Sequence, residues 1–120
     1  MHNFRELKIW QKSRNFVKEV YPLTAKFPDK EKYAFVSQIN RSVISISSNI
    51  AEGSGRKGKK DFQRFLDIAI GSAFELESQL LIANDLGYIS KETPSILTIK
   101  LQEIQKMIRG FRHHLEKSIV

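Results

Sequence analysis

The chain contains no cysteine, three prolines and six glycines among its 120 residues. The lack of cysteine excludes disulfides, thiolate metal sites and cysteine nucleophiles. No apolar run approaches the roughly 20 residues that are needed to span a bilayer. The first residues, MHNFRELKIWQKS, carry charges where a signal peptide would be apolar, so we expect a cytoplasmic protein.

Acidic residues are fewer than basic ones, and the imbalance is uneven along the chain. Twenty Lys and Arg stand against thirteen Asp and Glu, which gives a formal net charge of +7. Residues 53–64 carry five basic groups against Asp61 alone, whereas residues 65–99 sum to −4. Such a balance permits binding to nucleic acid or to an anionic membrane surface, and it fits a soluble protein with a lysine-rich face equally well.

Proline and glycine divide the chain into four long segments, in which apolar residues recur at steps of three and four. The four stripes are Trp10, Ser13, Val17, Val20, Thr24 and Phe27; Val36, Ile39, Val43, Ile46 and Ile50; Phe62, Leu66, Ala69, Ala73, Leu76, Leu80 and Ala83; and Leu97, Leu101, Ile104, Ile108, Phe111 and Leu115. This spacing puts each stripe on one face of a helix. The sequence therefore predicts an all-α, antiparallel up-down four-helix bundle, with a single domain over residues 1–120.

Individual residues predict where these helices begin and end. Asp29 is placed to cap the second helix and Ser90 to cap the fourth. Gly87 is placed to end the third helix in a left-handed conformation. Pro22 removes a backbone hydrogen bond within the first helix, so we expect a kink or a loosened last turn there.

The stretch SNIAEGSGRKGKK, residues 48–60, contains partial matches to two phosphate-binding motifs, G-x-G-x-x-G and the P-loop. Both motifs require a strand before the glycines, whereas the helical spacing of the second segment continues to Ile50. Lys60 also stands where a P-loop has Ser or Thr. We therefore interpret the stretch as a loop between helices with an exposed basic rim. The rim consists of Arg56, Lys57, Lys59 and Lys60.

The same stretch resembles a known family. QINRSVISISSNIAEGSGRKGKKDFQRFLDIAIGSAFELESQL, residues 38–80, is similar to the signature of the four-helix-bundle proteins encoded within intervening sequences of bacterial 23S ribosomal RNA genes. FRELKIWQKS, FPDKEKY and ANDLGYIS fit the flanks, and Ser47 stands where the family often has proline. The resemblance implies an all-α bundle, a homo-oligomeric ring of about five subunits (a pentamer) and a role in nucleic-acid binding. It extends to the accessory protein of diversity-generating retroelements, and it implies no catalytic residues.

The second segment is poor in charge on the side opposite its apolar stripe. That side carries Gln38, Arg41, Ser45 and Ser48. A face depleted in charge is typical of an interface core, so we predict that these residues lie between subunits; a serine-rich face exposed to solvent is the alternative. We expect Arg41 to pair with Asp67 or Glu75, within its subunit or across the interface.

The sequence offers few candidates for catalysis. None of the nine glutamates is followed by histidine three residues later, as in carboxylate-bridged di-iron bundles. Arg109 and His114 have the spacing of HEPN-type ribonucleases, in which arginine stabilises the phosphorane charge and histidine moves the proton. A basic end of the last helix, placed favourably for the helix dipole, accounts for the same residues. We therefore predict a protein without catalytic residues, metal, cofactor or small-molecule substrate.

These observations favour a basic homo-oligomeric bundle that binds nucleic acid, RNA more than DNA, through backbone contacts. No aromatic residues in an RNA-recognition motif are visible in the sequence, and no membrane partner is predicted. A protein–protein scaffold is the second hypothesis, and a HEPN-like ribonuclease is the third. The predicted nucleic-acid contacts are Arg56, Lys57, Lys59, Lys60, Lys106, Arg109 and Lys117.

Overall fold

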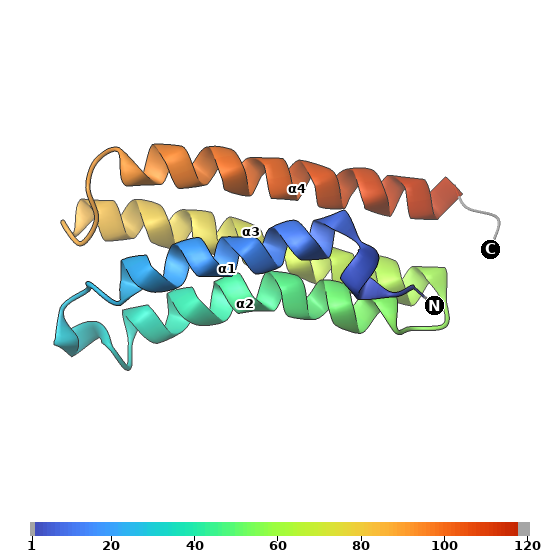
Figure 1. Cartoon of the computed structure of the whole chain (residues 1–120), viewed down its shortest axis with the longest axis horizontal. Helices are drawn as coiled ribbons and strands as arrows, with labels where there is room; N and C mark the ends of the chain where they lie inside the picture. The colour runs from blue at the N-terminus through green and yellow to red at the C-terminus, as the bar shows by residue number, and fades with distance from the viewer. Residues whose placement is uncertain (1, 118–120) are drawn as a thin grey trace.

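Four long helices run alternately up and down in the computed structural model, which describes residues 2–117 (Figure 1). They are α1 (Lys8–Thr24), α2 (Phe35–Ser54), α3 (Lys59–Asp85) and α4 (Thr93–Lys117). Short 3-10 turns, η1 (Phe4–Glu6) and η2 (Asp29–Glu31), precede α1 and α2. Each helix packs against the next, and α1 also packs against α4. The predicted four-helix bundle is confirmed. Within residues 2–117, no helix is long and apolar enough to cross a membrane.

The predicted apolar stripes form the core of the bundle. Nearly all their members are buried, and Trp10, Val17, Val36 and Phe111 lie half-buried at its edge. The stripe predicted for α1 omitted Phe16, which is only 1% exposed. It was missed because a helix that packs against two neighbours buries a wider face than one narrow stripe.

Gly87 ends α3 as predicted. Its φ is +78°, and its N–H donates to the carbonyl of Asn84 at 3.0 Å. The N–H of Tyr88 reaches back to the carbonyl of Ala83 at 2.9 Å, which completes a Schellman closure of the helix. At the end of α1, Pro22 falls in the last turn, and the helix stops two residues later at Thr24.

Two predicted helix starts are wrong. Asp29 opens η2 instead of capping α2, because its carbonyl accepts from Lys32 N–H at 3.1 Å and closes a separate turn. Helix α2 begins only at Phe35, without a side-chain cap. Helix α4 begins at Thr93 and not directly after Ser90, so Pro94 falls in the first turn, where its missing N–H costs no helical hydrogen bond.

An aromatic contact closes the end of the bundle where α1 passes to α2 and α3 passes to α4. The rings of Phe27 and Tyr88 lie 5.2 Å apart, and the ring of Phe35 lies 6.1 Å from that of Phe27. The Tyr88 hydroxyl donates to Glu31 Oε2 at 2.7 Å, and this hydrogen bond to a carboxylate raises the pKa of Tyr88 above its ordinary value. Two connections far apart in sequence are thereby tied together.

Candidate nucleic-acid interface

The opposite end of the bundle brings together three distant parts of the chain. The α2–α3 connection, the last turns of α4 and the N-terminal segment before α1 all lie there (Figure 1). Because consecutive helices run in opposite directions, the basic loop after α2 and the basic end of α4 necessarily reach the same end. Two basic groups that are separate in sequence therefore belong to one surface region.

This end also carries the net positive charge of the protein. Residues 2–16, 46–72 and 105–117 make up this half of the bundle and contain thirteen Lys and Arg against five Asp and Glu. The remaining residues contain seven Lys and Arg against eight Asp and Glu. We call the two halves the basic end and the neutral end. The field of the protein attracts a polyanion toward the basic end and not toward the neutral one.

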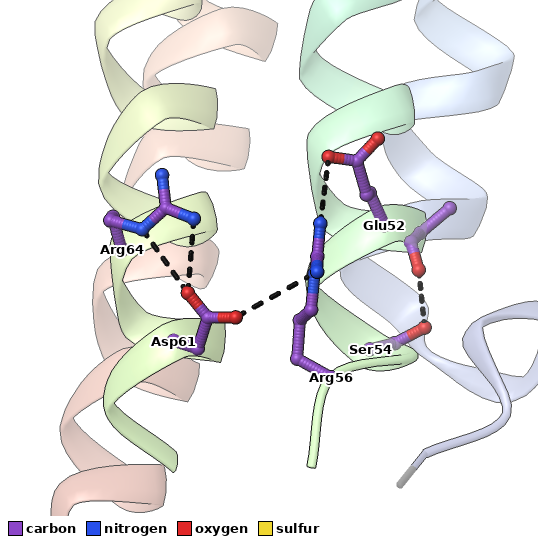
Figure 2. A network of polar contacts seen from close by, with 6 residues as sticks. Glu52, Ser54, Arg56, Asp61 and Arg64 are labelled. Carbon is purple, nitrogen blue, oxygen red and sulfur yellow. Dashed lines mark hydrogen bonds and ion pairs between the residues drawn. The ribbon is translucent and has the colours of Figure 1, made fainter. Parts of the chain in front are cut away.

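Arg56 is the centre of a polar network in the α2–α3 connection (Figure 2). Its guanidinium lies 3.6 Å from Glu52 Oε2 in α2 and 3.6 Å from Asp61 Oδ2 in α3, and 4.8 Å from the centre of the Phe65 ring. Arg64 donates two further hydrogen bonds to Asp61. The side chain thus joins the end of α2 to the start of α3, a role that the sequence did not reveal. Its predicted phosphate contact stays a prediction.

The other predicted nucleic-acid contacts divide into two groups. Lys57 and Lys60 in and beside the loop, and Lys117 in the last turn of α4, are exposed, and none of them forms an ion pair within residues 2–117. Lys59 is half-buried at the first position of α3. The second group, Lys106 and Arg109, lies near the middle of α4 and is also exposed. Its arginine is held 5.3 Å from the centre of the Phe74 ring of α3.

Gly53 allows α2 and α3 to approach each other at the basic end. A Cβ atom at this position would lie 2.8 Å from Phe62 Cδ1 and 2.8 Å from Phe65 Cβ, closer than real Cβ atoms come. The glycine therefore serves packing and not a phosphate cradle. The segment before the loop, residues 35–54, is α-helix, as its spacing predicted, and not the strand that either phosphate motif requires.

An aromatic cluster that the sequence did not predict lies beside this contact. The ring of His2 lies 5.3 Å from that of Phe62 and 5.9 Å from that of Phe111, and the two phenylalanines are 5.5 Å apart. The backbone N–H of His2 donates to the carbonyl of Ser54 at 2.9 Å, which fixes the N-terminal segment on the end of α2. The three rings come from distant positions, so only the packing of the bundle brings them together.

The predicted self-association face lies along the outer side of α2. Gln38, Arg41 and Ser48 are exposed there. Ser45 is half-buried instead, because its hydroxyl shares a 2.8 Å hydrogen bond with that of Ser72 in α3 and also accepts from the side-chain amide of Asn49. Three of the four predicted interface residues are thus available to a second copy of the chain, and Ser45 also holds α2 against α3.

The predicted ion pair of Arg41 within its own chain is wrong. Glu75 accepts a hydrogen bond from Ser42 at 3.0 Å, and Asp67 is bound by the guanidinium of Arg112 at 2.7 and 3.1 Å. This pairing with Asp67 raises the pKa of Arg112. Among residues 2–117, Arg41 forms no ion pair, so only the predicted pairing across an interface stays a prediction.

The two residues of the ribonuclease hypothesis do not share one face of α4. Five positions along a helix turn the side chain of His114 by about 140° from that of Arg109. Arg109 lies against Phe74 of α3, whereas His114 is exposed in the last turn. No group of three histidine, aspartate or glutamate side chains suited to a metal occurs among residues 2–117.

Comparison with known proteins agrees with the resemblance seen in the sequence. The model of the 23S rRNA-intervening sequence protein family matches residues 5–110. The chain is also similar to a crystal structure of a protein with unknown function from the S23 ribosomal protein family of Bacteroides thetaiotaomicron. The two are 27% identical with a TM-score of 0.80, over 88% of this chain and 95% of that chain. No curated protein matches the chain.

Proposed function

The chain belongs to the family of 23S rRNA-intervening sequence proteins, and we propose that it is a non-catalytic, homo-oligomeric protein that binds nucleic acid through the phosphate backbone. The observation that carries this proposal is the location of the net positive charge in one half of the bundle. Charge that serves only solubility does not need to gather at one end of the protein. Charge that is gathered at one end attracts polyanions there, which suits the binding of phosphates.

The basic end offers its charge through flexible side chains on a rigid frame. Lys57, Lys60 and Lys117 are exposed and form no ion pairs within the described part of the chain, so phosphates do not have to displace carboxylates to reach them. The Arg56 network holds the loop between α2 and α3 in place. The preference for RNA over DNA rests on the link between this family and ribosomal RNA genes.

The proposal predicts binding that weakens steeply with salt. Fluorescence anisotropy of labelled single-stranded and duplex RNA and DNA, measured over a series of NaCl concentrations, gives the slope of log affinity against log salt. Three phosphate contacts on each subunit would give a slope of about −2 for single strands, because each contact releases condensed counterions. Failure to bind any of these nucleic acids at low salt would contradict the proposal.

Self-association through the outer face of α2 predicts a clear effect of Ser48→Lys. Lysine at this exposed position adds a charge to a charge-poor face, so the variant should form a smaller species by multi-angle light scattering. Ser45 is unsuitable for this test, because lysine there would disturb the contact with Ser72 in any assembly state. Ser95→Lys, on the exposed side of α4, is the matched control. An unchanged mass for Ser48→Lys would place the interface elsewhere.

A protein–protein scaffold is the second candidate, and one observation favours it. Of the exposed large apolar side chains that the structure describes, all except Ile68 lie outside the residues of the basic end. Leu81 and Leu86 of the α3 region and Ile96 and Ile99 of α4 are each at least half exposed. If the salt series shows no binding to any of the nucleic acids, the scaffold hypothesis, with a protein partner at the neutral end, takes the place of the first.

A further inference from the structure

We propose that a cavity at the basic end receives one unpaired base of a single-stranded nucleic acid. This inference rests on the proposed function and goes beyond it. A protein that contacts phosphates alone would bind a strand with bases and an abasic strand equally well. It also assigns a place for base stacking, although the sequence shows no recognition motif with aromatic residues. The cavity, its aromatic wall and the charge around it carry the proposal.

The cavity lies between the start of α1 and the second half of α4. Its volume is about 420 Å³, within the range of pockets that hold small ligands. Its lining consists of Glu6, Leu7, Lys8, Ile9, Met107 and Phe111. Four of these six side chains are apolar, and the two charged ones are exposed, so the site combines an apolar interior with a polar rim.

Phe111 supplies an aromatic wall that is held in position by two neighbouring rings. Its ring packs against those of Phe62 and His2, at centroid distances of 5.5 and 5.9 Å. Met107 stands one turn earlier on the same face of α4, and its unbranched thioether side chain adapts to ligands of different outline. A fixed ring and an adaptable neighbour suit a nucleobase, since every base has a π-face that stacks on aromatic side chains.

The two charged residues at the rim suit the rest of a nucleotide. Lys8 forms no ion pair within residues 2–117 and is available to the phosphate that flanks an inserted base. The Glu6 carboxylate is an acceptor for the amino groups that adenine, guanine and cytosine carry on their edges. The cavity belongs to the half of the bundle that holds the net positive charge, so the strand that carries the base is attracted to the same place.

Two other cavities lack this combination. The one between α1 and α4 that includes Phe16 is flanked by the ion pairs Lys12–Glu103 and Lys100–Glu19, in which each charge already has a partner. The one beside Phe27 lies at the neutral end. In a duplex the bases are paired and stacked, so a base reaches the cavity beside Phe111 only from a single strand or after being flipped out. The occupant is therefore an unpaired base.

The test compares two labelled single-stranded oligonucleotides of equal length and equal phosphate charge, one with bases and one with abasic residues throughout. We expect the wild-type protein to bind the abasic strand about 5- to 150-fold more weakly, the range for losing one stacked base. Equal affinity for the two strands would overturn the base site and leave backbone binding intact. Failure to bind either strand would overturn both proposals.

A variant locates the effect in the cavity. Phe111→Leu removes the aromatic face and keeps an apolar side chain, so binding of the strand with bases should weaken while binding of the abasic strand stays unchanged. Phe35→Leu makes the same change to a half-buried ring at the neutral end and should alter neither affinity. Equal weakening of both strands by Phe111→Leu would contradict the base site. If circular dichroism shows that Phe111→Leu is unfolded, the comparison of the two strands on the wild-type protein decides.

Discussion

Replacing Gly53 with alanine is expected to destabilise the bundle by about 1–3 kcal/mol, the usual cost of forcing an extra methyl group into a packed site. The new Cβ would lie 2.8 Å from the Cβ of Phe65, which sits directly on the α3 backbone and cannot rotate away. Phe62, at the same distance, is 2% exposed and packs against His2 and Phe111. Relief therefore requires α2 and α3 to separate.

Urea denaturation followed by far-UV circular dichroism measures this loss of stability. Gly110→Ala is the matched control, because a Cβ at this exposed position in α4 meets nothing within 4 Å. Alanine there should stabilise the protein by about 1 kcal/mol through its higher helix propensity. The two variants should thus change stability in opposite directions, and a Gly53→Ala protein as stable as Gly110→Ala would refute the close-approach explanation.

Removing three lysines from the basic end is expected to have the largest effect on binding. In the variant Lys57→Ala, Lys60→Ala and Lys117→Ala, the affinity for single-stranded RNA should fall about 100-fold at 0.1 M salt, and the log–log slope should become shallower by about 2. Both changes follow from the loss of about 0.7 in slope for each phosphate contact. All three side chains are exposed, so the fold should remain intact.

A control with the same net charge separates local contacts from overall charge. Replacing Lys18, Lys26 and Lys30 with alanine removes three exposed lysines from the neutral end and leaves the basic end unchanged. This variant should keep nearly all of the affinity and the slope of the wild-type protein. If both variants lose affinity equally, the protein responds to polyanions through its net charge alone, and the basic end is not a binding site.

The residues behind the family resemblance serve mainly to close the two ends of the bundle. At the basic end, the glycine of SNIAEG packs against both phenylalanines of the segment FQRF, which follows it in α3. At the neutral end, Phe27 and Glu31 of FPDKEKY meet Tyr88 of ANDLGYIS. The segments that resemble the family in the sequence therefore contact each other in pairs in the structure.

The sequence by itself determined the four helices, most of the core and the end of α3. Helical spacing is a local property, because side chains three and four positions apart share a face whatever the rest of the chain does. Gly87 was predictable for the same reason, since a left-handed helix end depends on one residue and its immediate neighbours. The helix starts predicted at Asp29 and Ser90 were wrong, because a short turn follows each of these residues and the helix begins only after that turn.

Tertiary structure alone decided which charges and rings meet. Arg56 is exposed, as the basic rim predicted, but the turn between α2 and α3 also places it between Glu52 and Asp61, which the sequence did not indicate. Arg41 was expected to pair with Asp67 or Glu75, but Arg112 binds the first of these carboxylates and Ser42 the second. The cavity beside Phe111 exists only because the start of α1 lies against α4. Such contacts depend on the packing and relative position of helices that are distant in sequence, and spacing along one helix carries no information about them.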